Sequence, residues 1–317
     1  MKSPFVSIII PTYNRSAYLS KALNSLAEQS FRNFQIIVVD NCSTDNTRDI
    51  VYLFKDNHKN LEISYFYEPI PGLLSGRHRG AFEARGDILV FIDDDVEVTN
   101  LWLSSIVESF ALQDVGLATG PCIPRFEITP PKWTNLFWQK IDKGRFCTSF
   151  STIYIGNKMC YIDPLYVFGL NYSIRRDIFF ELKGFHPDCI PKRLQIYQGD
   201  GETGLSLKAR QKGIKALYHP YAMLYHNIPP DRVTLEYFKE RFFYQGVCNS
   251  YTQIRHNNGI ENIILPVKQI NKNFYLQDTQ HAYVDGFFFH FNAVKNSKTL
   301  LDWVLKENYL DYTLPEM

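Results

Sequence analysis

A run of five apolar residues that ends in three consecutive aspartates constrains the fold of this chain more than any other segment. Residues 88–92 have the composition of a strand buried on both faces of a parallel sheet. Asp93, Asp94 and Asp95 follow at its carboxyl end, the edge where ligands bind in open α/β sheets. Neighbouring carboxylates repel one another, so a divalent cation shared with a phosphate-bearing ligand would stabilise them. The alternative is an acidic turn before a helix that starts near Thr99.

The composition favours a globular protein that binds no nucleic acid. With 317 residues, the chain has room for one large domain and an appendage. Its 34 Lys and Arg residues nearly balance 33 Asp and Glu residues, unlike a protein that binds phosphate backbones. The six cysteines form no CxxC pair, so we expect reduced thiols rather than disulfides or a zinc site.

The amino-terminal apolar stretch is short and is interrupted by Pro11. We therefore interpret it as a first strand and not as a signal peptide. No run approaches the ~18 apolar residues of a membrane span. These features predict a cytoplasmic protein, with the inner face of the cell membrane as an alternative place of action.

Strand and helix patterns alternate through the first 120 residues or so. We expect strands at 5–10, 34–39, 63–67, 88–92 and 115–119, and helices at 16–29, 44–54, 73–84 and 100–111. Short connections between such units are typical of βαβ crossovers. The chain therefore belongs to the α/β class, with a mostly parallel sheet flanked by helices.

The rest of the chain is less regular. Residues 121–165 contain five prolines and are expected to form a long, partly ordered excursion over the site. Further elements are expected as strands at 167–174, 214–218 and 221–225, and as helices at 176–182, 203–212, 233–256 and 279–306. This pattern predicts a catalytic domain over 1–230 and a helical carboxyl-terminal region over 231–317.

Polar residues follow the first two expected strands. Pro11, Thr12, Tyr13 and Asn14 could hold a ligand, with the Tyr13 ring stacked on a base; an ordinary strand-to-helix turn explains them equally well. Asp40 ends the second strand, where a carboxylate can accept a hydrogen bond from a uracil imide or a ribose hydroxyl.

The glycine-rich segment 72–80 opens the third expected helix. Its basic side chains, Arg77 among them, could meet a diphosphate or a nucleoside, although a solvated basic face is the alternative. Trp133, Phe137 and Trp138 could stack on sugar rings or pack in a core.

Several motifs occur together in the order that is typical of one family. They are PTYNR near residue 11, DNCSTD at 40–45, GLLSGRHRGAFEARGD before residue 88, FIDDD at 91–95, GLNYSIRRDIFFELKGF at 169–185 and GDGETGLSLKARQKG at 199–213. In this arrangement the chain resembles glycosyltransferase family 2 over roughly residues 5–230. The resemblance implies a GT-A (Rossmann-like) fold and a nucleotide-sugar donor.

The resemblance also implies roles for individual residues at the donor site. Asp40 would read the base beside Pro11, Thr12, Tyr13 and Asn14, and Arg77 would lie near the nucleoside. Asp93 and Asp95 would be the outer acids of a DxD motif around Asp94. Asp93 would contact the ribose or a ligand of the metal. Asp95 would bind Mn²⁺ or Mg²⁺ directly, to stabilise the leaving diphosphate. Asn171 would line the donor-sugar or acceptor pocket.

The general base and the remaining metal ligand are less definite. The family's acid opens a helix in a Gly-Glu-Asp-like pattern, whereas this chain has Asp200 and Glu202 in GDGE. Counting back from Gly213 favours Glu202 as the base, with Asp200 as a helix-start or sugar-binding acid. His226 resembles a metal ligand, and His219 is its competitor.

Together these features predict an inverting glycosyltransferase. It would move a sugar from a nucleoside diphosphate, UDP being favoured, to a hydroxyl of a saccharide or lipid-linked saccharide. The inversion is implied by the resemblance alone. The alternatives are a protein that only binds nucleotide sugars or glycans, and a nucleotidyltransferase, which usually has a Gly-rich, Lys-containing loop after the first strand. The carboxyl-terminal helices are candidates for acceptor binding, membrane-surface contact, self-association or plain burial.

Overall fold

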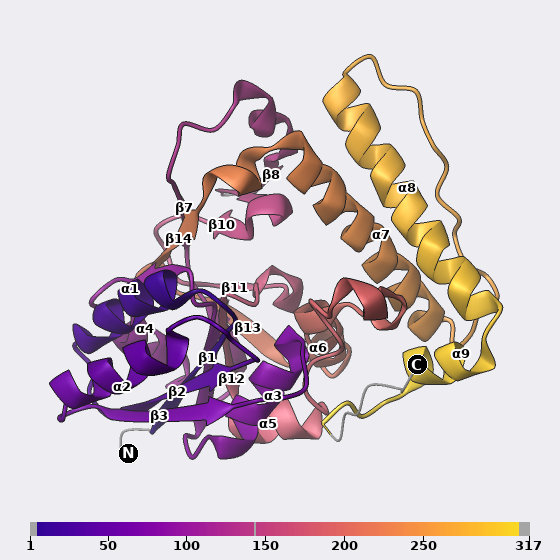
Figure 1. Cartoon of the computed structure of the whole chain (residues 1–317). Coiled ribbons are helices and arrows are strands. Elements are labelled where there is room, and N and C mark those ends of the chain that lie inside the picture. Colours follow the sequence, from indigo (N-terminus) through magenta and orange to yellow (C-terminus); the bar gives the residue numbers. More distant parts are fainter. Residues whose placement is uncertain (1–4, 143, 311–317) are drawn as a thin grey trace.

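A computed structural model describes residues 5–142 and 144–310 (Figure 1). Its strands are β1 (Val6–Thr12), β2 (Phe34–Asp40), β3 (Glu62–Tyr67), β4 (Ile88–Ile92), β5 (Val96–Val98), β6 (Val115–Thr119), β7 (Cys122–Phe126), β8 (Gln139–Ile141), β9 (Gly144–Cys147), β10 (Thr152–Tyr154), β11 (Cys160–Ile162), β12 (Asn171–Arg175), β13 (Lys215–Tyr218) and β14 (Leu224–Ile228). Its α-helices are α1 (Ser16–Ala27), α2 (Thr47–Asn57), α3 (Leu73–Glu83), α4 (Trp102–Ser109), α5 (Arg176–Glu181), α6 (Gly201–Gln211), α7 (Leu235–His256), α8 (Phe274–Lys295) and α9 (Lys298–Leu305).

The larger sheet has the strand order β11-β13-β6-β12-β4-β1-β2-β3. Strands β3, β2, β1 and β4 are parallel neighbours, and β12 runs antiparallel between β4 and β6. The register pairs Thr12 with Asp40, so the carboxyl ends of β1 and β2 lie side by side, next to the end of β4. The expected α/β fold with a mostly parallel sheet is confirmed.

Both faces of this sheet are covered, which is why β4 is apolar throughout. On one face, Ile8 packs in a core with Leu23 of α1 and Trp102 of α4. On the other face, Ile9 packs in a second core with Leu74 of α3 and Leu205 of α6. Successive strand residues alternate between the two cores, as the strand geometry requires.

A second sheet corrects the expectation for residues 121–165. Instead of a partly ordered excursion, this segment supplies β7 to β11, and four of these strands join a sheet of order β5-β14-β7-β10-β9-β8. Proline cannot donate a backbone hydrogen bond, so the prolines argued against strands in this segment. Pro124 nevertheless lies within β7, opposite His226 of β14. The partners of β5 and β7 lie on the distant β14, which no local pattern reveals.

The carboxyl-terminal helices pack closely on one another and on the catalytic region. α7 and α8 lie side by side (Figure 1), and the gap between them is narrow at Gly246, where an added Cβ would lie 2.0 Å from the Tyr283 carbonyl oxygen. The single helix expected at 279–306 is wrong: Ser297 accepts a hydrogen bond from the Leu300 N–H and starts α9 anew. Within the described residues, no helix combines the length and the apolar character needed to cross a bilayer.

Three buried histidines make the fold sensitive to acid. Burial lowers the pKa of His78 to about 3, and those of His186 and His290 to about 4, so all three are neutral in the folded chain. The unfolded chain binds protons near the ordinary value of 6.5. The free energy of unfolding is therefore highest, as far as these histidines determine it, above pH 6.5. It decreases as the pH falls toward 4, because the unfolded chain then binds protons that the folded chain does not.

We expect His290→Gln to weaken this pH dependence. Each such histidine contributes a slope of about 1.4 kcal/mol per pH unit, and the amide keeps a polar partner for the Ser250 hydroxyl, which lies 2.9 Å from His290 Nδ1. Urea unfolding at a series of pH values measures the slope. The exposed His256→Gln is the control, and equal slopes in His290→Gln and the unaltered protein would contradict the assignment.

Candidate active site

A pocket of about 610 Å³ opens at the carboxyl ends of β1, β2 and β4. It is lined by Pro11, Thr12, Tyr13, Arg15, Asn41, Cys42, Pro71, Gly72, Leu73, Asp93, Asp94, Asp95, Cys189, Ile190, Pro191 and Arg232. The three aspartates and the residues that follow β1 thus share one cavity, as the sheet order requires.

Asp94 is a buried bridge between the ends of β4 and β1. Its carboxylate accepts hydrogen bonds from Thr12 Oγ1 at 2.7 Å and from Arg15 Nη1 at 3.0 Å. Burial raises the pKa of Asp94 to about 7, although the Arg15 charge opposes this rise. Asp94 therefore ties the two strand ends together.

Asp95 is surrounded by cationic and imidazole groups. Its Oδ2 lies 2.7 Å from Arg15 Nη1 and 3.0 Å from Arg232 Nη1, and its Oδ1 lies 3.5 Å from His226 Nε2. Burial disfavours the charged form, but these neighbours, led by His226, hold the pKa of Asp95 below its usual range. The carboxylate is therefore ionised.

The orientation of His226 is set by a backbone carbonyl. Its Nδ1 lies 2.8 Å from the Phe150 oxygen, which can only accept, so Nδ1 carries a proton. The Nε2 atom then faces Asp95 and lies 3.1 Å from Arg232 Nη1.

Asp95 and His226 could hold a divalent cation if phosphate groups of a bound ligand supply further ligands. The buried Oδ1 of Asp95 has no hydrogen-bond partner and faces His226 Nε2. Across residues 5–142 and 144–310, no group of three or more His, Cys, Asp or Glu side chains is arranged to hold a metal ion. An oxygen and an imidazole nitrogen suit Mn²⁺, with phosphates and water as the remaining ligands.

Arg77 connects Asp93 with Glu202. The buried guanidinium lies 3.3 Å from Asp93 Oδ1 and 3.5 Å from Glu202 Oε2. Glu202 Oε1 also accepts a hydrogen bond from the Gly169 N–H at 3.3 Å, and a side chain at Gly169 would collide with the guanidinium. Glu202 and Asp93 are both partly exposed, so one arginine holds two accessible carboxylates beside the cleft.

Asp200 faces the protein interior instead. Its Oδ1 lies 2.6 Å from His186 Nδ1, and its Oδ2 accepts from Thr252 Oγ1 of α7 at 2.7 Å. Burial raises the pKa of Asp200, but His186 and Thr252 outweigh that effect and lower it. Asp200 is thus an ionised link between the start of α6 and the helix α7.

The loops that follow β1 and β2 are joined to each other by hydrogen bonds. Asp40 accepts hydrogen bonds from the Ser43 N–H and the Tyr65 hydroxyl, which leaves one further acceptor position on each of its oxygens. Asn14 adopts a left-handed conformation with φ 52°, and its Oδ1 accepts from the Thr44 N–H at 2.7 Å. Tyr13 lines the pocket and is 58% exposed, so its ring is accessible for stacking.

Asn171 lies away from the pocket. It is fully buried, its Oδ1 accepts from Trp102 Nε1 at 3.0 Å, and its Nδ2 donates to the Ala222 carbonyl at 3.0 Å. These contacts connect β12 with α4 and with the segment before β14. His219 lies beside Glu108 rather than beside the aspartates, and Trp133 packs against Phe238.

Comparison with known proteins identifies the family. The model for "Glycosyl transferase family 2" matches residues 7–181. The chain belongs to this family. Glycosyltransferase AglE of Haloferax volcanii is 35% identical over 119 residues, which cover 37% of this chain and 39% of that relative. The match therefore spans well under half of the relative's length.

Two solved structures show the same GT-A fold. A mannosyltransferase from Pyrobaculum calidifontis, in complex with GDP-Man and Mn²⁺, has a TM-score of 0.58 at 19% identity and covers 98% of this chain and 86% of its own. Staphylococcus aureus TarS 1-349, in complex with UDP-GlcNAc, has a TM-score of 0.51 at 15% identity, with 92% and 91% covered.

Two arginines at the centre of this site gave no usable signal in the sequence. Arg15 lies within the family motif PTYNR, but the motif does not say that its side chain reaches Asp94 and Asp95. Arg232 lies outside all the motifs that the sequence contains. It reaches Asp95 because the short helical turn η5 (Pro230–Val233) follows closely after β14.

We expect Asp200→Ala to destabilise the protein by about 3 kcal/mol or more, because it leaves His186 and Thr252 without their buried partner. Glu202→Gln should change the free energy of unfolding by less than about 1 kcal/mol, since Glu202 is partly exposed. Urea unfolding measures both variants. Equal stability losses would contradict the distinction between the two acids.

Proposed function

We propose that this protein is an inverting glycosyltransferase, which transfers a sugar from a nucleoside diphosphate to a hydroxyl of a saccharide or lipid-linked saccharide. The observation that carries the proposal is that Arg77 links Glu202 to Asp93, which lines the large pocket. This link joins a donor-side acid to a partly exposed carboxylate that can accept a proton. Family membership and the GT-A fold support the same reaction class.

The nucleotide would occupy the end of the pocket near β1 and β2. Tyr13 would stack on the base, and Asp40 has acceptor positions for an imide N–H or a ribose hydroxyl. The two structural neighbours carry GDP-Man and UDP-GlcNAc, which supports a nucleotide sugar as the class of donor. We favour UDP because a single carboxylate at Asp40 matches the single imide N–H of uracil.

The diphosphate would lie against Asp95, His226, Arg15 and Arg232. A divalent cation, Mn²⁺ or Mg²⁺, would be held by Asp95 and His226 and would act as a Lewis acid toward the leaving phosphate. The Asp95 Oδ1, which has no hydrogen-bond partner, and the His226 Nε2 that faces it at 3.5 Å support this assignment. Arg15 and Arg232 already balance the carboxylates, and they can turn toward the phosphate oxygens when a donor binds.

Glu202 would act as the general base. The acceptor hydroxyl gives its proton to the Glu202 carboxylate while its oxygen bonds to the anomeric carbon. The bond from that carbon to the diphosphate oxygen breaks, and the nucleoside diphosphate leaves with the electron pair. One such displacement inverts the anomeric carbon. The Arg77 guanidinium contacts both Glu202 and Asp93 and thereby fixes the position of Glu202 relative to Asp93.

The catalytic domain would comprise residues 1–230, and residues 231–317 would form the acceptor side of the protein. The division falls in the turn η5, directly before α7. α7 contacts the catalytic part through Thr252 and through the buried Tyr251 and Ile254. A protein that only binds nucleotide sugars is the rival, and donor turnover separates the two.

We expect Glu202→Gln to lower kcat by at least about a hundredfold while the affinity for the donor is retained, because the amide cannot accept the proton. Release of nucleoside diphosphate from UDP- and GDP-sugars with Mn²⁺ measures turnover, and calorimetry measures donor binding. Asp163→Asn, an exposed acid, is the control. Near-normal turnover in Glu202→Gln would rule out this base, and no release from any donor would favour a binding protein.

We expect Arg232→Gln to bind Mn²⁺ more tightly than the unaltered protein when no nucleotide is present. The substitution removes a positive charge that contacts both Asp95 and His226, and a gain of about fivefold corresponds to about 1 kcal/mol. Calorimetry with MnCl₂ measures the affinity, and the exposed Arg48→Gln is the control. Weaker Mn²⁺ binding in Arg232→Gln than in the control would contradict the proposed pair of ligands.

A further inference from the structure

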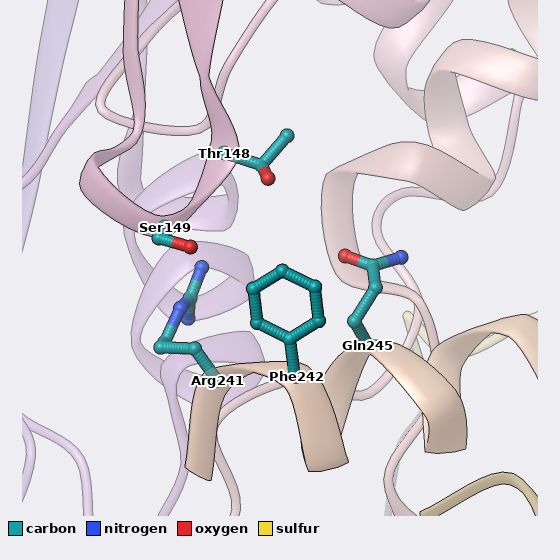
Figure 2. A pocket seen from close by; sticks show the side chains of 5 residues that line it. All are labelled: Thr148, Ser149, Arg241, Phe242 and Gln245. Carbon is teal, nitrogen blue, oxygen red and sulfur yellow. The ribbon is translucent and has the colours of Figure 1, made fainter. Parts of the chain in front are cut away.

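A second, smaller pocket lies between α7 and the short helical turn η2 (Thr148–Phe150). Figure 2 shows its lining: Arg241, Phe242 and Gln245 from α7, and Thr148 and Ser149 from η2. Its volume is about 30 Å³, which is room for a water-sized group but not for a sugar ring. The pocket can therefore receive one or two oxygen atoms of a larger molecule, but not a whole sugar.

Arg241 is the unusual member of this pocket. Its side chain is partly buried, yet it makes no hydrogen bond and no ion pair with any residue in the described ranges 5–142 and 144–310. In Figure 2 the guanidinium points toward the Ser149 hydroxyl and stands beside the Phe242 ring. Arginines with a purely structural role usually donate to carbonyls or carboxylates, as Arg175 does to the Val115 and Phe110 carbonyls.

The small pocket lies near one wall of the large cleft. Glu240 precedes Arg241 on α7, and its Oε1 lies 2.9 Å from the Nζ of Lys192. Lys192 follows Pro191, which lines the cleft. Arg241 is not among the groups around Asp94 and Asp95, where Arg15 and Arg232 serve the diphosphate in the proposed function. In the proposed function Arg241 is therefore close to the cleft wall but apart from the diphosphate, which leaves the acceptor as the ligand that it could contact.

We propose that Arg241 binds an acidic group, a phosphate or a carboxylate, on the sugar acceptor. The inference rests on the proposed transferase function. A guanidinium offers paired N–H donors that match two oxygens of one anion, and the hydroxyls of Ser149 and Thr148 and the Gln245 amide add further donors around it. An acceptor with a negative charge near its reacting hydroxyl is thereby selected over a neutral one.

The test uses glucose 6-phosphate as an anionic probe and glucose as its neutral counterpart. Calorimetry is carried out with UDP and Mn²⁺ present, so that the donor site is occupied. Arg241→Gln should bind glucose 6-phosphate at least about tenfold more weakly than the unaltered protein. Lys239→Gln removes the same charge from an exposed position of α7 and should bind it normally. Thermal unfolding verifies that both variants fold.

Equal affinity for glucose 6-phosphate in Arg241→Gln and the unaltered protein would overturn the proposal. Arg241→Gln could instead bind UDP-glucuronic acid more weakly while it binds UDP-glucose and glucose 6-phosphate normally. That result would place the acidic group on the donor and would also overturn the proposal. Crystals soaked in inorganic phosphate provide the location: density at Arg241 supports the site, and density only beside Arg15 and Arg232 contradicts it.

Donor turnover by the unaltered protein separates this proposal from the function on which it rests. Release of nucleoside diphosphate together with unchanged probe binding in Arg241→Gln rejects the anion site alone. Probe binding that depends on Arg241, without release from any nucleotide sugar, rejects the transferase function and leaves an anion site.

Discussion

The site depends on the neutralisation of the buried carboxylates at the end of β4. Asp94 and Asp95 are almost fully buried, and ionised carboxylates are stable there only with cations in contact. Arg15 comes from the turn after β1, and His226 and Arg232 come from β14 and the turn that follows it. Charge compensation therefore joins the large, mostly parallel sheet to the second sheet at one corner of the pocket.

A second arginine organises the opposite side of the cleft in a similar way. Arg77 of α3 is buried and holds the partly exposed Asp93 and Glu202, which come from β4 and α6. The absence of a side chain at Gly169 makes room for the guanidinium. One guanidinium thus holds both carboxylates, so the position of Glu202 is tied to that of Asp93.

The carboxyl-terminal helices belong to this arrangement. α7 supplies Thr252 to Asp200, at the start of the helix that carries Glu202, and it supplies Arg241 to the small pocket beside the cleft. α8 packs along α7 through backbone approaches at Gly246 and Gly286. The helical region therefore supports the acid at the start of α6 and supplies one side of the small pocket.

The sequence by itself determined the order of the first strands and helices, because a buried parallel strand needs a continuous apolar run and each βα unit is local. It also determined that the acids after β4 and the polar residues after β1 and β2 share one sheet edge. Only the tertiary structure decided which side chains meet there. Asp200 and Glu202 are two residues apart, yet Asp200 is buried against His186 while Glu202 is partly exposed beside Arg77. Arg15 and Arg232 reach Asp95 from distant segments, and the short strands β5 and β7 pair with the remote β14. Such contacts depend on the packing of whole sheets, which no local pattern of residues encodes.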